Sequence, residues 1–162
     1  MGVVNVALTV VAIRLIDSVG RRALLLIGLL GMAVCLVLLG LGVAIGGSSA
    51  ALGWITAFSL AAYVGFFAIG LGPVFWLLIA EIFPLDVRGR GMGVATIANW
   101  GFNLLVTVTF LELIEILGRP GTFFLYAFFT VAAYVFTWTL VRETKGRSLE
   151  DIEADLRLQR AA

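Results

Sequence analysis

The chain has 162 residues, of which 62% are hydrophobic and only 13% charged, and its net charge is +1. Because soluble domains carry roughly 25% charged residues, this composition indicates an integral membrane protein. Histidine is absent, which excludes histidine metal sites and histidine general bases, and the single cysteine, Cys35, cannot form an internal disulfide. We expect no enzymatic activity, no cofactor and no nucleic-acid partner.

Apolar segments follow one another at about residues 3–16, 23–45, 51–80, 91–111 and 122–141. The first is shorter than the ~20 residues that cross a bilayer, so we expect upstream sequence to be missing. The third exceeds that length, which predicts a tilt or a kink. The pattern predicts an all-α, polytopic transmembrane bundle of about five spans over residues 1–141, embedded in a lipid bilayer.

The third segment contains a predicted helix break at Gly70, Gly72 and Pro73. Proline has no N–H to donate, and its ring crowds the preceding turn. Backbone groups freed inside a membrane must face protein or water, so such breaks can mark transport sites. A kinked packing helix without any ligand is the alternative.

Polar residues of the fourth segment recur every three or four positions, at Thr96, Asn99, Asn103 and Thr107. They form one helical stripe with Trp100 beside it, and polar side chains in a membrane usually face the bundle interior. Asparagine supplies hydrogen-bond donors and acceptors, and indole supplies a flat apolar face. Together with Trp76 of the third segment, Asn99, Trp100 and Asn103 would suit a sugar; helix packing is the alternative.

Basic residues gather at alternate connectors: of the eleven lysines and arginines, only Arg119 falls on the opposite side. By the positive-inside rule, the shared side is the cytoplasm, which also receives the C-terminus. Residues 142–162 then form a cytoplasmic tail, and a capping box at Ser148 and Asp151 predicts a short amphipathic surface helix there. Acidic residues at the same membrane face could pair with the arginines as a latch, or remain solvated.

These motifs together resemble the sugar-porter family of the major facilitator superfamily. The matching stretches are DSVGRR at 17–22, GPVFW at 72–76, EIFPLDVRG at 81–89, NW at 99–100 and ETKG at 143–146. The resemblance covers nearly the whole chain and implies the last five helices of a twelve-helix transporter, whose N-terminal half would be the missing partner. Ser18 and Arg142 depart from the family pattern, in which a basic residue and a proline are usual.

The resemblance also implies roles for individual residues. Trp76 and Asn99 would contact the sugar, with Trp100 next to it. A cytoplasmic charge network would comprise Asp17, Arg21, Arg22, Glu81, Arg88 and Glu143. The implied mechanism is alternating access in the plasma membrane, coupled to protons in symporting members. The alternatives are transport of a polyol or organic acid, and a truncated membrane protein that transports nothing.

Overall fold

A computed structural model describes residues 2–45, 50–141, 143 and 145. This part of the chain folds into helices α1 (Gly2–Val19), α2 (Arg21–Ile45), α3 (Ala50–Gly70), α4 (Gly72–Ile82) and α5 (Arg88–Leu140), with no strand among the described residues. The prediction of an all-α fold is therefore confirmed. The predicted amphipathic helix of the tail lies outside the described residues.

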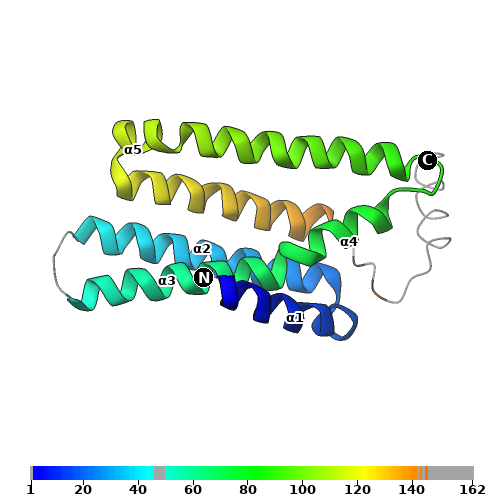
Figure 1. Cartoon of the computed structure of the whole chain (residues 1–162), viewed down its shortest axis with the longest axis horizontal. Helices are drawn as coiled ribbons and strands as arrows, with labels where there is room; N and C mark the ends of the chain where they lie inside the picture. Colours follow the sequence, from blue (N-terminus) through cyan, green and yellow to red (C-terminus); the bar gives the residue numbers. More distant parts are fainter. Residues whose placement is uncertain (1, 46–49, 142, 144, 146–162) are drawn as a thin grey trace.

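The longest helix, α5, is a hairpin of two helical arms. It has 53 residues, and its backbone leaves the helical region at Gly118, where φ is 71° and ψ is 166°. Residues 88–117, the first arm, and residues 119–140, the second arm, lie side by side in Figure 1. With α1, α2 and the α3–α4 pair, the two arms make five rods, in agreement with the five predicted segments.

The polar residues from Glu112 to Gly121, between the fourth and fifth apolar segments, predict a loop, and this prediction is wrong in length. The first arm stays helical through Glu112 and Glu115, because glutamate is compatible with a helix. Only Gly118 breaks the helix, since glycine reaches positive φ without a steric penalty. Pro120 follows within the first turn of the second arm, where its missing N–H costs little.

Three helical stretches are long and apolar enough to cross a membrane within the described residues: Arg21–Ile45, Leu52–Ile82 and Arg88–Leu140. The second of these stretches joins α3 and α4 across their junction, and the third contains both arms of α5. The short α1, with 18 residues, is not among them.

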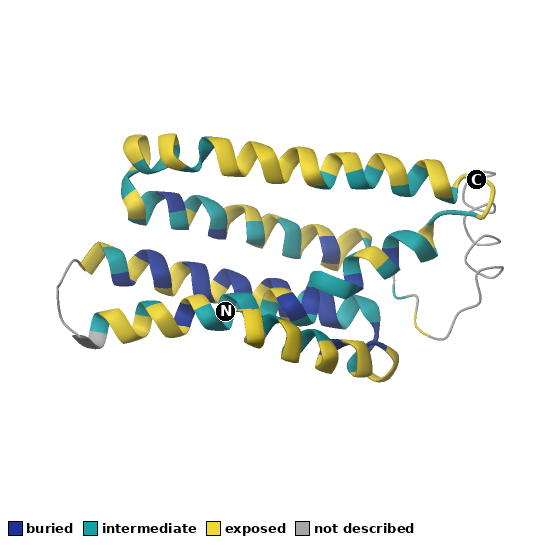
Figure 2. Ribbon diagram, viewed as in Figure 1, coloured by how far each residue is buried: buried dark blue, intermediate teal, exposed yellow. Residues whose placement is uncertain are grey.

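The buried core is centred on α2, which packs along α3 and along α5. Figure 2 shows α2 largely buried and the first arm of α5 exposed along most of its length. Glycines let α2 and α3 approach closely: a Cβ atom placed on Gly28 would lie only 2.7 Å from Cα of Gly70. At one end of the bundle, Leu24 and Val74 are completely buried in a cluster that joins α1, α2 and α4.

The helix connections alternate between the two ends of the bundle. Figure 1 shows the α1–α2 connection, the α4–α5 connection and the end of α5 together at one end. The end of α2, the start of α3 and the hairpin turn of α5 lie at the other. Arg21 and Arg88 therefore share one end, and Arg119 lies at the opposite end, as alternating spans require.

Candidate functional site

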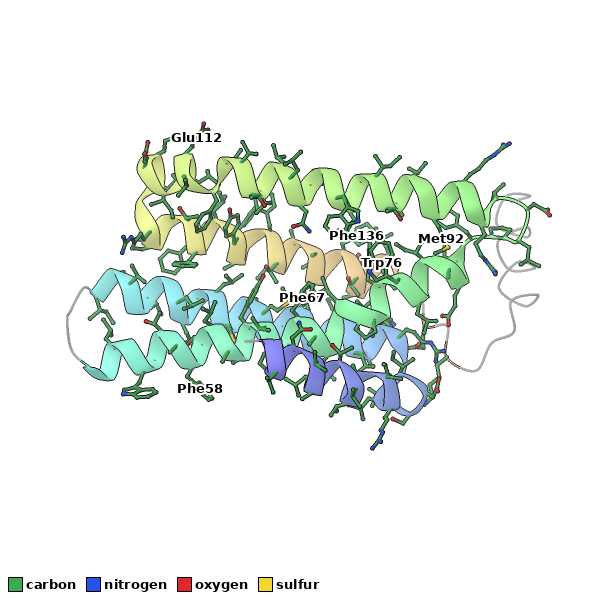
Figure 3. The ribbon with its side chains drawn as sticks, in the orientation of Figure 1. Phe58, Phe67, Trp76, Met92, Glu112 and Phe136 are labelled. Carbon is green, nitrogen blue, oxygen red and sulfur yellow. The ribbon has the colours of Figure 1, made fainter. Side chains whose placement is uncertain are left out.

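A groove of about 860 Å³ separates the α3–α4 pair from the first arm of α5. All four residues proposed from sequence to bind substrate line it, although they come from two separate segments: Trp76, Asn99, Trp100 and Asn103. Figure 3 shows Trp76 and Phe67 between the α3–α4 pair and α5. The groove opens to the surface, where 36% of Trp76 and 66% of Trp100 are exposed.

The wall from α3 and α4 is a stripe of residues at helical spacing. Phe67, Leu71, Phe75 and Ile79 follow one another at intervals of four, with Gly72 and Trp76 beside them. The stripe continues through the helix junction because the N–H of Leu71 still donates to the carbonyl of Phe67, at 2.9 Å. The ring of Trp76 packs edge to face on Phe75, with 5.2 Å between ring centroids.

The three residues of the predicted helix break have different positions. Gly70 ends α3 and packs against Gly28 of α2, so its missing side chain serves helix packing. Gly72 begins α4 and lines the groove. Pro73 lies in the first turn of α4, where proline is tolerated. The junction is slight, because Leu71 itself keeps a near-helical φ of −90° and ψ of −29°.

On the wall from α5, the asparagines and the threonines of the polar stripe have different roles. Asn99 and Asn103 line the groove. The hydroxyls of Thr96 and Thr107 instead donate to backbone carbonyls one turn earlier, each at 2.8 Å. These threonines therefore satisfy their hydroxyl donors within the helix.

Sequence reasoning missed the aromatic residues that complete the groove. Phe67, Phe75 and Phe102 line it in addition to the two tryptophans. The signal for Phe67 was its spacing of four residues from Leu71 and eight from Phe75, which places the three on one side of a helix if the break at Pro73 is slight. An expected sharp break obscured this relationship.

A second site, the charge cluster, lies where α1, α2 and α4 meet the end of α5. The guanidinium of Arg21 contacts Glu81 at 3.2 Å and Asp17 at 3.4 Å. Only 15% of the Arg21 side chain and 18% of the Glu81 side chain are exposed, whereas Asp17 is 86% exposed. The pair with Glu81 is thus the shielded one, and the exposed pair with Asp17 contributes little.

Glu143 joins the charge cluster through backbone groups. Its two carboxylate oxygens accept hydrogen bonds from the backbone N–H groups of Arg21, at 2.9 Å, and Arg22, at 3.1 Å. The guanidinium of Arg22 donates to the carbonyl of Trp138. The structure thus brings together five of the six residues expected in the charge network. Arg88 instead donates through Nε to the carbonyl of Phe83, at 3.2 Å, within the α4–α5 connection.

Comparison with known proteins relates the chain to membrane transporters. A family model described as "Sugar (and other) transporter" matches residues 1–156. The putative metabolite transport protein YwtG of Bacillus subtilis (strain 168) is 43% identical over 97% of this chain, and the D-xylose transporter of Levilactobacillus brevis is 37% identical over 97%. This chain spans 34% of each relative's length, about one third.

The fold also matches a solved transporter structure. The inward open conformation of the xylose transporter XylE from E. coli superimposes with a TM-score of 0.85 and 37% sequence identity, over 94% of this chain and 34% of that chain. The helices of this chain are thus arranged as in one third of that transporter.

Proposed function

Because the chain belongs to the sugar transporter family, whose model matches it from residue 1 to residue 156, we propose that it supplies one side of the substrate site of a sugar transporter. The chain is an integral membrane protein that would form the C-terminal part of the transporter. The observation that carries the proposal is the groove, where Trp76 of α4 meets Asn99 and Asn103 of α5.

The chemistry of the groove suits a sugar. A sugar ring has apolar C–H faces that an indole can cover, and hydroxyls that an asparagine amide can pair as donor or acceptor. The volume of about 860 Å³ lies within the range of roughly 300–1,000 Å³ typical of small-molecule sites. Trp76 would cover one face of the ring, and Asn99 and Asn103 would bind hydroxyls.

The groove favours a neutral ligand over an organic acid. No charged side chain is among the described residues that line it. A carboxylate entering the membrane interior would need a cation to offset its desolvation, and the groove provides none. A polyol remains the second candidate, since it offers the same hydroxyls. Any proton-coupling carboxylate would lie outside the described groove.

The missing side of the groove would come from the other two thirds of the transporter. Trp100 is 66% exposed and Phe102 68% exposed, although both line the groove. Exposed aromatic residues of this kind mark a surface that another part of the protein covers. In alternating access, the two parts would rock about the substrate, with the charge cluster on the cytoplasmic side of the plasma membrane.

The test uses a chimera in which this chain replaces the matching third of the L. brevis D-xylose transporter. We expect the chimera, reconstituted in liposomes, to take up D-xylose. A chimera that inserts and folds but moves no sugar would refute the transport proposal and favour a chain that does not transport. This readout is independent of any single residue.

Two variants of the chimera then test the groove. Asn99→Ala should weaken binding of a sugar whose hydroxyl it meets by roughly 5- to 150-fold, since an unmade buried hydrogen bond costs ~1–3 kcal/mol. The matching deoxy-sugar should lose less. Trp76→Ala should weaken binding of both sugars about equally, because the indole of Trp76 would cover an apolar face that the two sugars share.

The matched controls are Asn5→Ala in α1 and Trp54→Ala, whose indole is 77% exposed in α3. Neither residue lines the groove, so both controls should bind as the unmodified chimera does. Calorimetry with the sugar pair measures all four variants. If Asn99→Ala bound both sugars as tightly as the unmodified chimera, the asparagines would be packing residues.

A further inference from the structure

The start of α2 is capped by a carboxylate that comes from the far end of the chain. The first N–H groups of a helix have no acceptor within the helix, and a carboxylate there is favoured by the helix dipole. The acceptor usually belongs to the residue just before the helix. Here that residue is Gly20, which has no side chain, and Glu143 binds the N–H groups of Arg21 and Arg22 instead.

The backbone at Gly20 is shaped to admit this carboxylate. Its φ is +100°, a conformation that strains any residue with a side chain. A Cβ atom at this position would lie 2.6 Å from Oε2 of Glu143, closer than real Cβ contacts. Glycine at residue 20 therefore meets two requirements: it adopts the positive φ, and it leaves space for Glu143.

The end of α5 is capped in the opposite direction. The last carbonyls of a helix also lack partners, and a cation is favoured beside them. Arg22, in the first turn of α2, donates from its guanidinium to the carbonyl of Trp138, in the last turn of α5. The start of α2 thus receives an anion from Glu143, just after α5, and the end of α5 receives a cation from α2.

We propose that Glu143 and Arg22 form a reciprocal cap that joins the start of α2 to the end of α5, and that Glu143 is a positioning residue for Arg21. The backbone of Arg21 is held by Glu143, while its guanidinium contacts Glu81 in the last turn of α4. Glu81 lies five residues after Trp76 of the groove. The cap therefore links the tail to α4 through a single arginine.

This assignment differs from a network of side-chain ion pairs. If Glu143 acts as a helix cap, its effect depends on the backbone amides and on an oxygen acceptor at residue 143. If Glu143 acts through side-chain ion pairs, its effect depends on the guanidinium of Arg22. Removing the charge at position 22 while leaving the backbone amides in place distinguishes the two cases.

The experiment measures solvent exchange of the backbone amides of Arg21 and Arg22 in the full chain, labelled with ¹⁵N-arginine and held in detergent micelles. Glu143→Ala should accelerate exchange at both amides about 5- to 30-fold, the range expected for loss of a helix cap. Glu143→Gln should retain most of the protection, because its amide oxygen still accepts. Arg22→Gln should leave the Arg21 amide protected.

Glu115→Ala is the matched control, because Glu115 is an exposed glutamate of α5 near the hairpin turn, at the opposite end of the bundle, and it should change neither rate. The proposal fails if the Arg21 and Arg22 amides exchange in Glu143→Ala at the same rate as in the unmodified chain. It also fails if Arg22→Gln accelerates exchange of the Arg21 amide as much as Glu143→Ala does. If Glu143→Ala does not fold, Glu143→Gln tests the proposal instead. The cap is refuted if the Arg21 and Arg22 amides of Glu143→Gln exchange as fast as unprotected arginine amides. None of these rates depends on sugar transport.

Discussion

Replacing Gly28 by alanine should separate α2 from α3, whereas the same change at Gly42 of the same helix should be tolerated. A Cβ atom on Gly28 would lie 2.7 Å from Cα of Gly70 and 2.9 Å from the carbonyl oxygen of Phe66. Both are backbone atoms, which cannot rotate away. Ordinary contact begins at 3.4 Å, so the two backbones must separate by about 0.7 Å, the difference between 3.4 and 2.7 Å.

Two opposing terms set the size of the effect. Overpacking a close helix contact costs about 1–3 kcal/mol, and alanine gains about 1 kcal/mol over glycine inside a helix. Gly28→Ala should therefore lose about 0–2 kcal/mol of stability. A Cβ on Gly42 would meet only Oγ1 of Thr56, at 3.7 Å, so Gly42→Ala should keep the gain. The two variants should differ by about 1–3 kcal/mol.

The measurement is unfolding of the full chain by a titration with sodium dodecyl sulfate, followed by circular dichroism. Both variants exchange the same residue types in the same helix, so intrinsic helix propensity cancels in the comparison. Equal midpoints, or a higher midpoint for Gly28→Ala than for Gly42→Ala, would show that the close approach of α2 and α3 does not limit stability.

Two further predictions concern topology and a buried hydroxyl. In a Cys35→Ala chain, cysteines at Ser18 and Glu112 should react with an impermeant maleimide from opposite faces of the membrane, Ser18 from the cytoplasm; labelling of both from one face would refute the alternating arrangement. The hydroxyl of Tyr126 is buried without a hydrogen-bond partner in the described part of the chain, so Tyr126→Phe should leave thermal stability unchanged or raise it, by up to ~1–3 kcal/mol. A clear loss of stability in that variant would reveal a hydrogen bond to the hydroxyl.

The fold could be predicted from the sequence because the apolar segments and the alternating basic connectors are long-range patterns in composition. Their ends were harder to place. Glu112 and Glu115 read as loop residues because they are charged, yet a charged residue at a membrane surface can remain helical. The helix ends only where the backbone must turn, at Gly118.

The candidate site could be predicted in part. Asn99 and Trp76 stand out because asparagine and tryptophan are conspicuous inside apolar segments, and the groove contains both. Phe67 does not stand out, since a phenylalanine among apolar residues carries no signal until the course of the helix past Pro73 is known. The capping role of Glu143 was also out of reach, because it depends on backbone amides 121 and 122 residues away in sequence.

The one-residue turn at Gly118 constrains the length of α5 as well as its direction. A longer connection could absorb an added or deleted residue by changing its path. Here an insertion between Asn103 and Gly118 would rotate Asn99 about the helix axis by ~100° relative to the second arm and shift it by ~1.5 Å. The residue count of the first arm therefore fixes how Asn99 is oriented relative to the second arm.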